Sequence, residues 1–522
     1  MKNRMKCCDY NLVFVSFLLV SSYSIKEAFG NDDCRLYLSE SKVRPKEWGI
    51  FVGRDVKRGM AVSTPDMILQ LTDFYSSSID GNNQHFYSID GHETGGQYEG
   101  RDVASLIPGI GMLAQRASEN SNVMGFRPTV DEGNLPRTTS PASGSFTHYY
   151  NYTFYATHPL AAGTELILRP SRSSTTTTTT TTNKNTISFY TKEMSHLRQN
   201  GYCLDSLRMI SSPDEENTRG RGAIATKYIR QGDVIMVSPM LKLSSSNMTY
   251  SIPSPKKKKK KKSSPSNNNR TQLIMNYCFV NESNNDEYYF PMAPMVNFIN
   301  HHEDDHNVRV QWSKTLLHDT PLLEYIATQT ILPGQQVFLD YGNAWQTAWR
   351  HHVQHWKPLY ADDRYTPSYI MDDVASIIRT QTEQSQQNHP YPSNLQTSCF
   401  FQYQQPNDSS PSLNSDKTTT IPWNHTRETF YFHNLYPCDI LDRTSHSKHH
   451  HTYMVRMKNL PYAKDKVFPT INNQYIIVSK VPRQAIRFTD RLYTTDQHLP
   501  NVFRHPIRVQ SSTKYNTEKD EF

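Results

Sequence analysis

Residues 334–342 read Gly-Gln-Gln-Val-Phe-Leu-Asp-Tyr-Gly and close the part of the chain that decides its fold. Upstream of this stretch lie Asn297-Phe298-Ile299-Asn300-His301 and, earlier still, Gly220-Arg221-Gly222. The sequence between these motifs contains short apolar runs, such as residues 223–225 and 337–339, an alternating segment at 323–328, and tight turns that end in glycine. Such runs and turns are typical of strands, so we expect a small, strand-rich unit here.

The same pattern occurs once more, nearer the N-terminus. Residues 47–51 and 56–59 match residues 220–224 and 229–232 at an offset of 173. Residues 156–157 and 160–163 match residues 327–328 and 331–334 at an offset of 171. Two nearly equal offsets indicate an internal duplication, with Cys34 and Cys203 beginning the first unit and the second unit.

The order of the three motifs resembles that of the SET-domain protein-lysine methyltransferases. The resemblance covers about residues 203–357, with a fainter copy at about 34–171, and its specific parts are the Asn-His step and the final Asp-Tyr-Gly. Asn307, seven residues after Asn300, also suits the family, whereas His302 replaces the usual serine. The resemblance implies a mainly β fold with some helix: two SET-type, β-clip-like units in tandem, followed by a small β-rich C-terminal module.

The resemblance also implies S-adenosylmethionine as cofactor and a protein lysine as methyl acceptor. The backbone of Gly220, Arg221 and Gly222 is then expected beside the methionine end of the cofactor, where glycine allows a close approach. Asn300 and His301 are expected to hold its adenine and amino groups.

On the acceptor side, the resemblance makes Tyr341 the catalytic residue, with its hydroxyl beside the transferring methyl group. A lysine must lose its proton and its water and be aimed before it can attack. Tyr277 and Trp345 are expected to line the substrate channel.

A helix is predicted directly after Gly342. Trp345, Ala348, Trp349, His352, Val353 and Trp356 follow a helical spacing, and three tryptophans share one face. Core packing is the usual role of such a stripe; the other interpretation is that the helix roofs the lysine channel. Many SET enzymes close theirs with a cysteine–zinc segment, but no cysteine follows Tyr341 until Cys399, so no structural metal is expected.

The first unit lacks the residues that carry this chemistry. Glu47 stands where Gly220 stands, and Ala114-Gln115 aligns with Asn300-His301 if Pro108 is matched to Pro294. Arg169-Pro170 replaces Asp340-Tyr341, and proline can neither donate a hydrogen bond nor orient an amine. The first copy is therefore interpreted as a degenerate scaffold or substrate-docking lobe.

The remaining segments complete the predicted domain organisation. A basic start, a short apolar run and Ala28-Phe29-Gly30 predict a signal peptide over residues 1–30. The further boundaries are a degenerate SET-like domain at 31–171, a threonine-rich linker at 172–200, a SET domain at 201–357 with a lysine-rich insert at 244–271, a low-complexity linker at 358–423, the C-terminal module at 424–508 and a tail at 509–522.

Charge and cysteine content limit the partners and the compartment. The net charge of +7 equals the seven lysines of residues 256–262, so no nucleic-acid partner is expected. Five cysteines remain after the signal peptide, widely spaced and without a CxxC pair, which favours neither a disulfide framework nor a zinc ribbon. A soluble protein of the secretory pathway is predicted, with a plastid-type route or the nucleus as less favoured destinations. The alternative function is a non-catalytic SET-like scaffold or binding protein of that pathway.

Overall fold

A computed structural model describes most of the chain between residues 34 and 509. The described residues are 34–72, 96–98, 101–117, 120–126, 135, 137–147, 149, 151–169, 189–211, 220–252, 269–281, 284–313, 320–358, 366, 368–386, 390–402, 420–430, 434–447, 450–458, 475–491 and 494–509. The predicted signal peptide, the threonine run, the seven-lysine run and the predicted tail beyond residue 509 lie outside these ranges.

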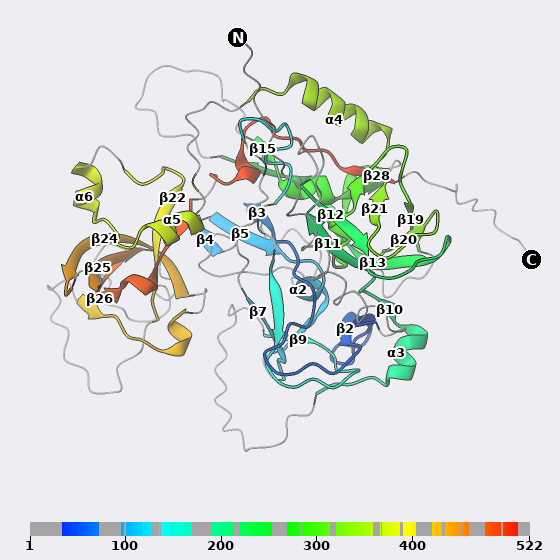
Figure 1. Cartoon of the computed structure of the whole chain (residues 1–522), viewed down its shortest axis with the longest axis horizontal. Coiled ribbons are helices and arrows are strands. Elements are labelled where there is room, and N and C mark those ends of the chain that lie inside the picture. Colours follow the sequence, from blue (N-terminus) through cyan, green and yellow to red (C-terminus); the bar gives the residue numbers. More distant parts are fainter. Residues whose placement is uncertain are drawn as a thin grey trace, which may run out of the picture.

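The second unit is strand-rich, as its short apolar runs predicted (Figure 1). Its strands are β11 (Leu207–Ser211), β12 (Arg221–Ala225), β13 (Val234–Ser244), β14 (Thr249–Ser251), β15 (Asn269–Thr271), β16 (Phe279–Asn281), β17 (Asn284–Pro291), β18 (Asn300–His301), β19 (Val308–Trp312), β20 (Leu322–Ala327) and β21 (Gln336–Leu339). Short 3-10 turns η3 (Ser245–Met248), η4 (Leu273–Tyr277) and η5 (Val296–Phe298) connect them, and helix α4 (Asn343–His355) follows. Most of these strands join one sheet in the order β11-β12-β21-β19-β20-β13-β17-β16, while β14 pairs with β15.

The first unit forms three small sheets. Its elements are β1 (Leu36–Glu40), β2 (Trp48–Val52), β3 (Leu69–Thr72), β4 (Gly96–Tyr98), β5 (Arg101–Leu106), α2 (Ile110–Leu113), β6 (Gln115–Arg116), β7 (Val123–Phe126), β8 (Thr153–Ala156) and β9 (Ile167–Leu168). Helix α3 (Met194–Asn200) and strand β10 (Tyr202–Cys203) follow, and β10 pairs with β1. Part of the predicted linker at 172–200 is therefore helical, and Leu197 of α3 is buried against Tyr37 and Phe51.

The two units share one pairing pattern. In the first, Val123 of β7 lies opposite Ala156 of β8 and Leu168 of β9. In the second, the corresponding strands pair Val308 with Ala327 and Leu339, again antiparallel and then parallel. Ala327 follows Ala156 by 171 residues, and Leu339 follows Leu168 by the same number. This is one of the offsets found in the sequence.

A buried asparagine stands just before β7 and β19 and makes the same two hydrogen bonds in each unit. Asn122 donates to the Glu165 carbonyl at 2.7 Å and accepts from the Ile167 N–H at 2.8 Å. Asn307 donates to the Gln336 carbonyl and accepts from the Phe338 N–H, both at 2.9 Å. Asn307 thus holds β21 through two hydrogen bonds to its backbone.

The structure corrects the alignment of the first unit by one residue. Gly109 and Met295 both have a positive φ, of 68° and 66°, but their ψ angles differ, at −124° and −19°. Each directly follows one of the two matched prolines, Pro108 and Pro294. The helix after Gly109 contains four residues, however, whereas η5 contains three. The extra residue shifts the following strand, so that Gln115 and not Ala114 occupies the register position of Asn300.

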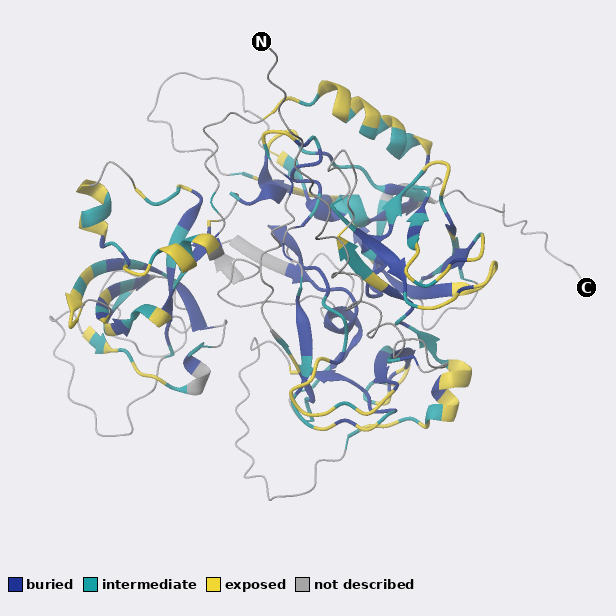
Figure 2. Ribbon diagram, viewed as in Figure 1, coloured by how far each residue is buried: buried dark blue, intermediate teal, exposed yellow. Residues whose placement is uncertain are grey.

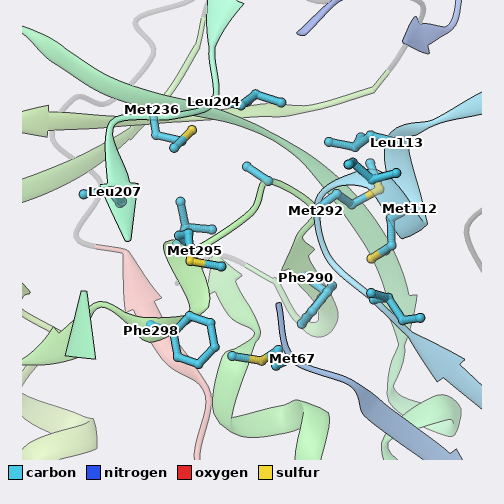
Figure 3. Close-up of a cluster of buried hydrophobic side chains, with 14 of the residues drawn as sticks. Met67, Met112, Leu113, Leu204, Leu207, Met236, Phe290, Met292, Met295 and Phe298 are labelled. Carbon is cyan, nitrogen blue, oxygen red and sulfur yellow. The ribbon is translucent and has the colours of Figure 1, made fainter. Parts of the chain in front are cut away.

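A single hydrophobic core spans both units. Figure 3 shows Met67, Met112 and Leu113 of the first unit in the same cluster as Phe290, Met292 and Met295 of the second. Burial of apolar surface is the main favourable contribution to folding. We therefore expect the two units to fold as one body.

The structure contains two disulfides, which the number and spacing of the cysteines did not indicate. Cys34 is bonded to Cys203, and Cys399 is bonded to Cys438. Cys278 is the free cysteine of the described residues and is buried. Pairs separated by 169 and 39 residues leave no local spacing signal, which explains why counting and spacing missed them.

The C-terminal module begins earlier than predicted and has its own core. Its elements are α5 (Ser368–Val374), α6 (Gln381–Gln386), β22 (Leu395–Phe400), β23 (Thr420–Pro422), η6 (Arg427–Phe430), β24 (Leu435–Ser445), β25 (His451–Lys458), β26 (Tyr475–Pro482), η9 (Arg483–Ala485) and β27 (Ile486–Asp490). The sheet order is β23-β26-β25-β24-β22-β27, so β22 and β23 make the predicted linker at 358–423 part of the module. Figure 1 shows these strands grouped at one side of the molecule.

The chain then returns from this module to the second unit. After η10 (Asp496–His498), strand β28 (Ile507–Val509) pairs in parallel with β16. Residues 496–498 bond to Arg137, Gln70 and Thr72 of the first unit, and residues 503–509 contact the second unit, so this end of the predicted 424–508 module reaches both units. No helix in the described part of the chain is both long and apolar enough to cross a lipid bilayer.

Candidate functional site

A pocket of about 360 Å³ lies where the motifs of the second unit meet. Six residues singled out from the sequence line it: Arg221, Tyr277, Asn300, His301, Tyr341 and Trp345. Gly220 and Gly222 are not among the lining residues. The structure thus brings the predicted side chains together around one cavity.

Gly222 is required by its neighbours. A Cβ at this position would lie 2.4 Å from Gln336 Nε2 and 3.2 Å from Asn300 Nδ2, so the amides would have to move. Asn300 also donates through Nδ2 to the Arg221 carbonyl at 2.8 Å. The glycine motif and the Asn-His step are therefore held against each other. Gly220 has a φ of 62°, a left-handed conformation that favours glycine.

His301 is held as a neutral ring. Its Nδ1 accepts the Tyr341 N–H at 3.0 Å, so the proton lies on Nε2, which donates to Gln346 Oε1 at 2.8 Å. Burial lowers the pKa of His301, although the Gln346 hydrogen bond and Asp340 oppose this shift. The ring therefore carries no charge at neutral pH and serves as a spacer between β18 and α4.

Tyr341 presents a protonated hydroxyl to the pocket. The hydroxyl donates to the Ile299 carbonyl at 2.5 Å. Burial, with a smaller contribution from the nearby Tyr277, raises the pKa of Tyr341 well above its usual range. A phenol in this state can orient a partner by hydrogen bonding but cannot remove a proton from it.

The tryptophans of α4 do not enter the core. No residue of α4 is buried, and Figure 2 shows the helix with a largely exposed outer surface. Trp345 and Trp349 stack with ring centroids 5.9 Å apart and meet Phe503 edge-on, at 5.3 and 5.0 Å. All three residues line the pocket, so the structure places the stripe at the pocket wall and not in the core.

Residues 503–507, called the closing segment below, were not predicted as part of the site. Phe503 and Ile507 line the pocket, and the Ile507 N–H donates to the Cys278 carbonyl at 2.8 Å. Phe146 of the first unit and Phe298 also line it. No local sequence signal marks Phe146 or Phe503, because each reaches the pocket only through contacts with residues distant in sequence. Gln346 also lines the pocket, and its place beside Trp345 in the predicted helix could have identified it as a site residue.

The pocket suits a cationic cofactor. Its volume falls within the range of about 300–1,000 Å³ typical of small-molecule sites. Aromatic faces of Tyr341 and Trp345 attract cations, and Asp304 also lines the pocket, while Glu303 is paired with Arg350 at 2.6 Å. These residues therefore fit a sulfonium compound such as S-adenosylmethionine. Among the described residues no group of histidine, cysteine or acidic side chains is arranged to hold a metal ion.

A buried carboxyl of the first unit supports the turn that leads into the pocket. Asp66 accepts backbone hydrogen bonds from Met67, at 2.8 Å, and from Met295, which precedes η5. Burial raises the pKa of Asp66 to about 7, although both hydrogen bonds oppose the shift. The Oδ2 atom of Asp66 is buried without a hydrogen-bond partner in the described residues.

This carboxyl predicts a pH dependence of stability. Between pH 3.8, where an ordinary aspartic acid ionises, and pH 7 the folded state keeps a proton that the unfolded chain has lost. The contribution of Asp66 is therefore fully present below pH 3.8 and is lost as the pH rises to 7. Relative to wild type, Asp66→Asn should gain stability between pH 4 and pH 8, by an amount on the order of a few kcal/mol.

Urea denaturation of both proteins at several pH values measures this difference. Asp55→Asn is the matched control, because Asp55 is an exposed carboxylate of the same unit that accepts a backbone hydrogen bond from Ala162. Parallel pH profiles of wild type and Asp66→Asn would contradict the prediction.

Residues 220–342 match the family model described as SET domain. No curated protein matches the chain. Among solved structures, it is similar to a Plasmodium falciparum protein provisionally assigned as a histone methyltransferase, with 14% identity, 27% of this chain and 96% of that chain covered, and a TM-score of 0.19.

Two further solved structures are similar over about the same share of this chain. CpSET8 from Cryptosporidium has 15% identity, with 28% of this chain and 61% of that chain covered and a TM-score of 0.18. The complex ctPRC2, in an autoinhibited conformation bound to S-adenosylmethionine, has 16% identity, with 26% of this chain and 15% of that chain covered and a TM-score of 0.20. The family match and the motifs in the pocket lead to one conclusion: the chain contains one SET domain, at residues 220–342.

Proposed function

We propose that the protein is an S-adenosylmethionine-dependent protein-lysine methyltransferase that acts through the SET domain of its second unit. The observation that carries this proposal is the meeting of Arg221, Asn300, His301 and Tyr341 around one pocket. Bound S-adenosylmethionine would supply an electrophilic methyl group on a sulfonium. The backbone at Arg221 and the side chain of Asn300 would hold it, with His301 keeping β18 in place.

Tyr341 is proposed to aim the acceptor. Because its hydroxyl stays protonated, it orients the amine and takes no proton from it. The lysine would lose its proton to solvent before it enters, so that its neutral nitrogen could accept the methyl group while a neutral thioether leaves. Tyr277 and Trp345 line the path of the aliphatic side chain, where their rings exclude water.

We also propose that the first unit is a degenerate copy of the SET domain. The shared strand registers and the twin asparagines Asn122 and Asn307 support a common origin. At the position of Tyr341 the first unit has Pro170, and at that of Asn300 it has Gln115. Such a copy retains the fold without the groups that the reaction needs.

Asn300→Ala tests the cofactor site. The variant loses the hydrogen bond between the Asn-His step and the Arg221 carbonyl, so we expect S-adenosylmethionine to bind about tenfold more weakly. Calorimetric titration of the full chain measures the affinity, and transfer of a labelled methyl group to lysine peptides measures the activity. Asn424→Ala, in the C-terminal module, is the control. Wild type that binds cofactor but methylates nothing would favour the alternative, a non-catalytic scaffold; wild type that does neither would refute the proposal.

For the compartment, we propose entry into the secretory pathway. The two disulfides support this, because disulfides persist in oxidising compartments. Sequencing the N-terminus of the mature protein tests the proposal, since retention of residues 1–30 would overturn it.

A further inference from the structure

The pocket of the SET domain has a wall that comes from the first unit. Met67, Ser145 and Phe146 line the cavity together with the residues of the second unit. The proposed catalytic site is therefore incomplete without the first unit.

Residues 144–147 are clamped in place from several sides. Asn276 donates through Nδ2 to the Ser145 carbonyl at 3.0 Å, and Arg504 donates to the Gly144 carbonyl at 2.7 Å. The Thr147 N–H donates to the Tyr277 hydroxyl at 3.5 Å, and the Thr147 carbonyl accepts from the Arg221 guanidinium. This segment is thus held by polar groups of the pocket itself.

Asn276 joins three parts of the chain at this point. Its amide donates to Ser145 of the first unit and, also at 3.0 Å, to the Phe503 carbonyl of the closing segment. Its Oδ1 accepts from the His505 N–H at 2.9 Å. The first unit and the closing segment are consequently fixed relative to each other across the pocket.

Within residues 144–147, Phe146 is the residue whose side chain is open to contact with a bound molecule. Its neighbours Ser145 and Thr147 are buried, whereas Phe146 is only half-buried and lines the cavity. The hydrogen bonds of both neighbours to Asn276 and Tyr277 hold Phe146 next to Tyr277, which is proposed above to line the path of the acceptor lysine. Met67, which is buried behind the same wall, extends the apolar surface.

We infer that Phe146 is a specificity-determining residue, and that the first unit selects acceptor lysines that have an apolar residue next to them. A half-buried aromatic ring gains most from an apolar side chain that covers it. Its rigid backbone makes the contact selective, because little freedom is lost on binding. This inference rests on the proposed methyltransferase function and adds the substrate class.

The test uses the full chain, labelled S-adenosylmethionine and short peptides with one central lysine. The adjacent position carries an apolar, an acidic or a small polar residue. For wild type we expect a kcat/KM about tenfold higher with the apolar neighbour. In Phe146→Ala this preference should nearly vanish through a higher KM, while S-adenosylmethionine affinity stays within about twofold.

Two variants keep the result interpretable. Phe146→Leu retains an apolar surface and should retain most of the preference. Tyr190→Ala removes an exposed aromatic of the first unit outside the pocket lining and should behave as wild type. Thermal midpoints of all variants identify a variant that fails to fold. If Phe146→Ala fails to fold, the comparison of Phe146→Leu with wild type decides. An unchanged preference for the apolar neighbour in Phe146→Leu supports the inference, and a lost preference contradicts it.

Other results distinguish the specificity role of Phe146 from the methyltransferase function on which it rests. Equal preferences in wild type and a folded Phe146→Ala would overturn the specificity role while leaving the methyltransferase in place. A parallel loss of cofactor affinity would assign Phe146 to the cofactor wall and overturn it too. Wild type that binds cofactor but methylates no peptide would overturn both.

Discussion

Replacing Tyr341 by phenylalanine should slow methyl transfer by about two to three orders of magnitude while leaving cofactor affinity within about twofold. The substitution removes only the hydroxyl that donates to the Ile299 carbonyl inside the pocket. The ring remains packed against His301 and Trp345, at centroid distances of 5.3 and 5.0 Å. Single-turnover transfer to a lysine peptide measures the rate, and calorimetry measures the affinity.

Tyr453→Phe is the matched control for this prediction. Tyr453 is also buried, and its hydroxyl accepts the Ile378 N–H at 3.1 Å, but it lies in the core of the C-terminal module. Its loss should cost about 1 kcal/mol of stability and leave transfer unchanged. An undiminished rate in Tyr341→Phe would remove Tyr341 from the proposed catalytic role.

Removing the disulfide between Cys34 and Cys203 should give the largest loss of stability. The bond connects residues 169 apart in sequence and ties the start of the first unit to the start of the second. In the chain-entropy model, a cross-link over such a loop lowers the free energy of the folded state relative to the unfolded state by about 5 kcal/mol, and measured values of about 2–5 kcal/mol are usual. Calorimetric unfolding of a Cys34→Ser, Cys203→Ser double variant tests this.

The second disulfide provides the comparison. Cys399 and Cys438 are 39 residues apart, so the same model gives an effect about 1 kcal/mol smaller when both become serine. That loss should appear in the unfolding of the C-terminal module, which has its own core. An unchanged midpoint for the core shared by the two units, after removal of the Cys34–Cys203 bond, would contradict the prediction.

The sequence predicted what depends on local pattern. The strands around residues 223–225, 323–328 and 337–339 and the helix after Gly342 follow from short apolar runs, glycine turns and helical spacing. The pocket residues Asn300, His301 and Tyr341 were found because each lies in a short motif with a fixed order.

What remained hidden depends on contacts distant in sequence. The side-chain amide of Asn276 donates to the carbonyls of Ser145, which precedes Phe146, and of Phe503, and both partners lie more than a hundred residues from it. The one-residue shift at Gln115 arises from the length of a single helical turn, which the hydrophobic pattern does not reveal. The disulfide partners were equally inaccessible, because geometry and not spacing determines which cysteines meet.

The return of the chain from the C-terminal module to β16 has a consequence for biosynthesis. Roughly 150 residues separate α4 from Phe503, and at about 5–20 residues per second their translation takes on the order of 10–30 s. During that interval Trp345 and Trp349 have no Phe503 to cover them. A nascent chain would therefore display a bare aromatic surface until Phe503 emerges, and we expect chaperones to bind it there and shortened translation products to aggregate.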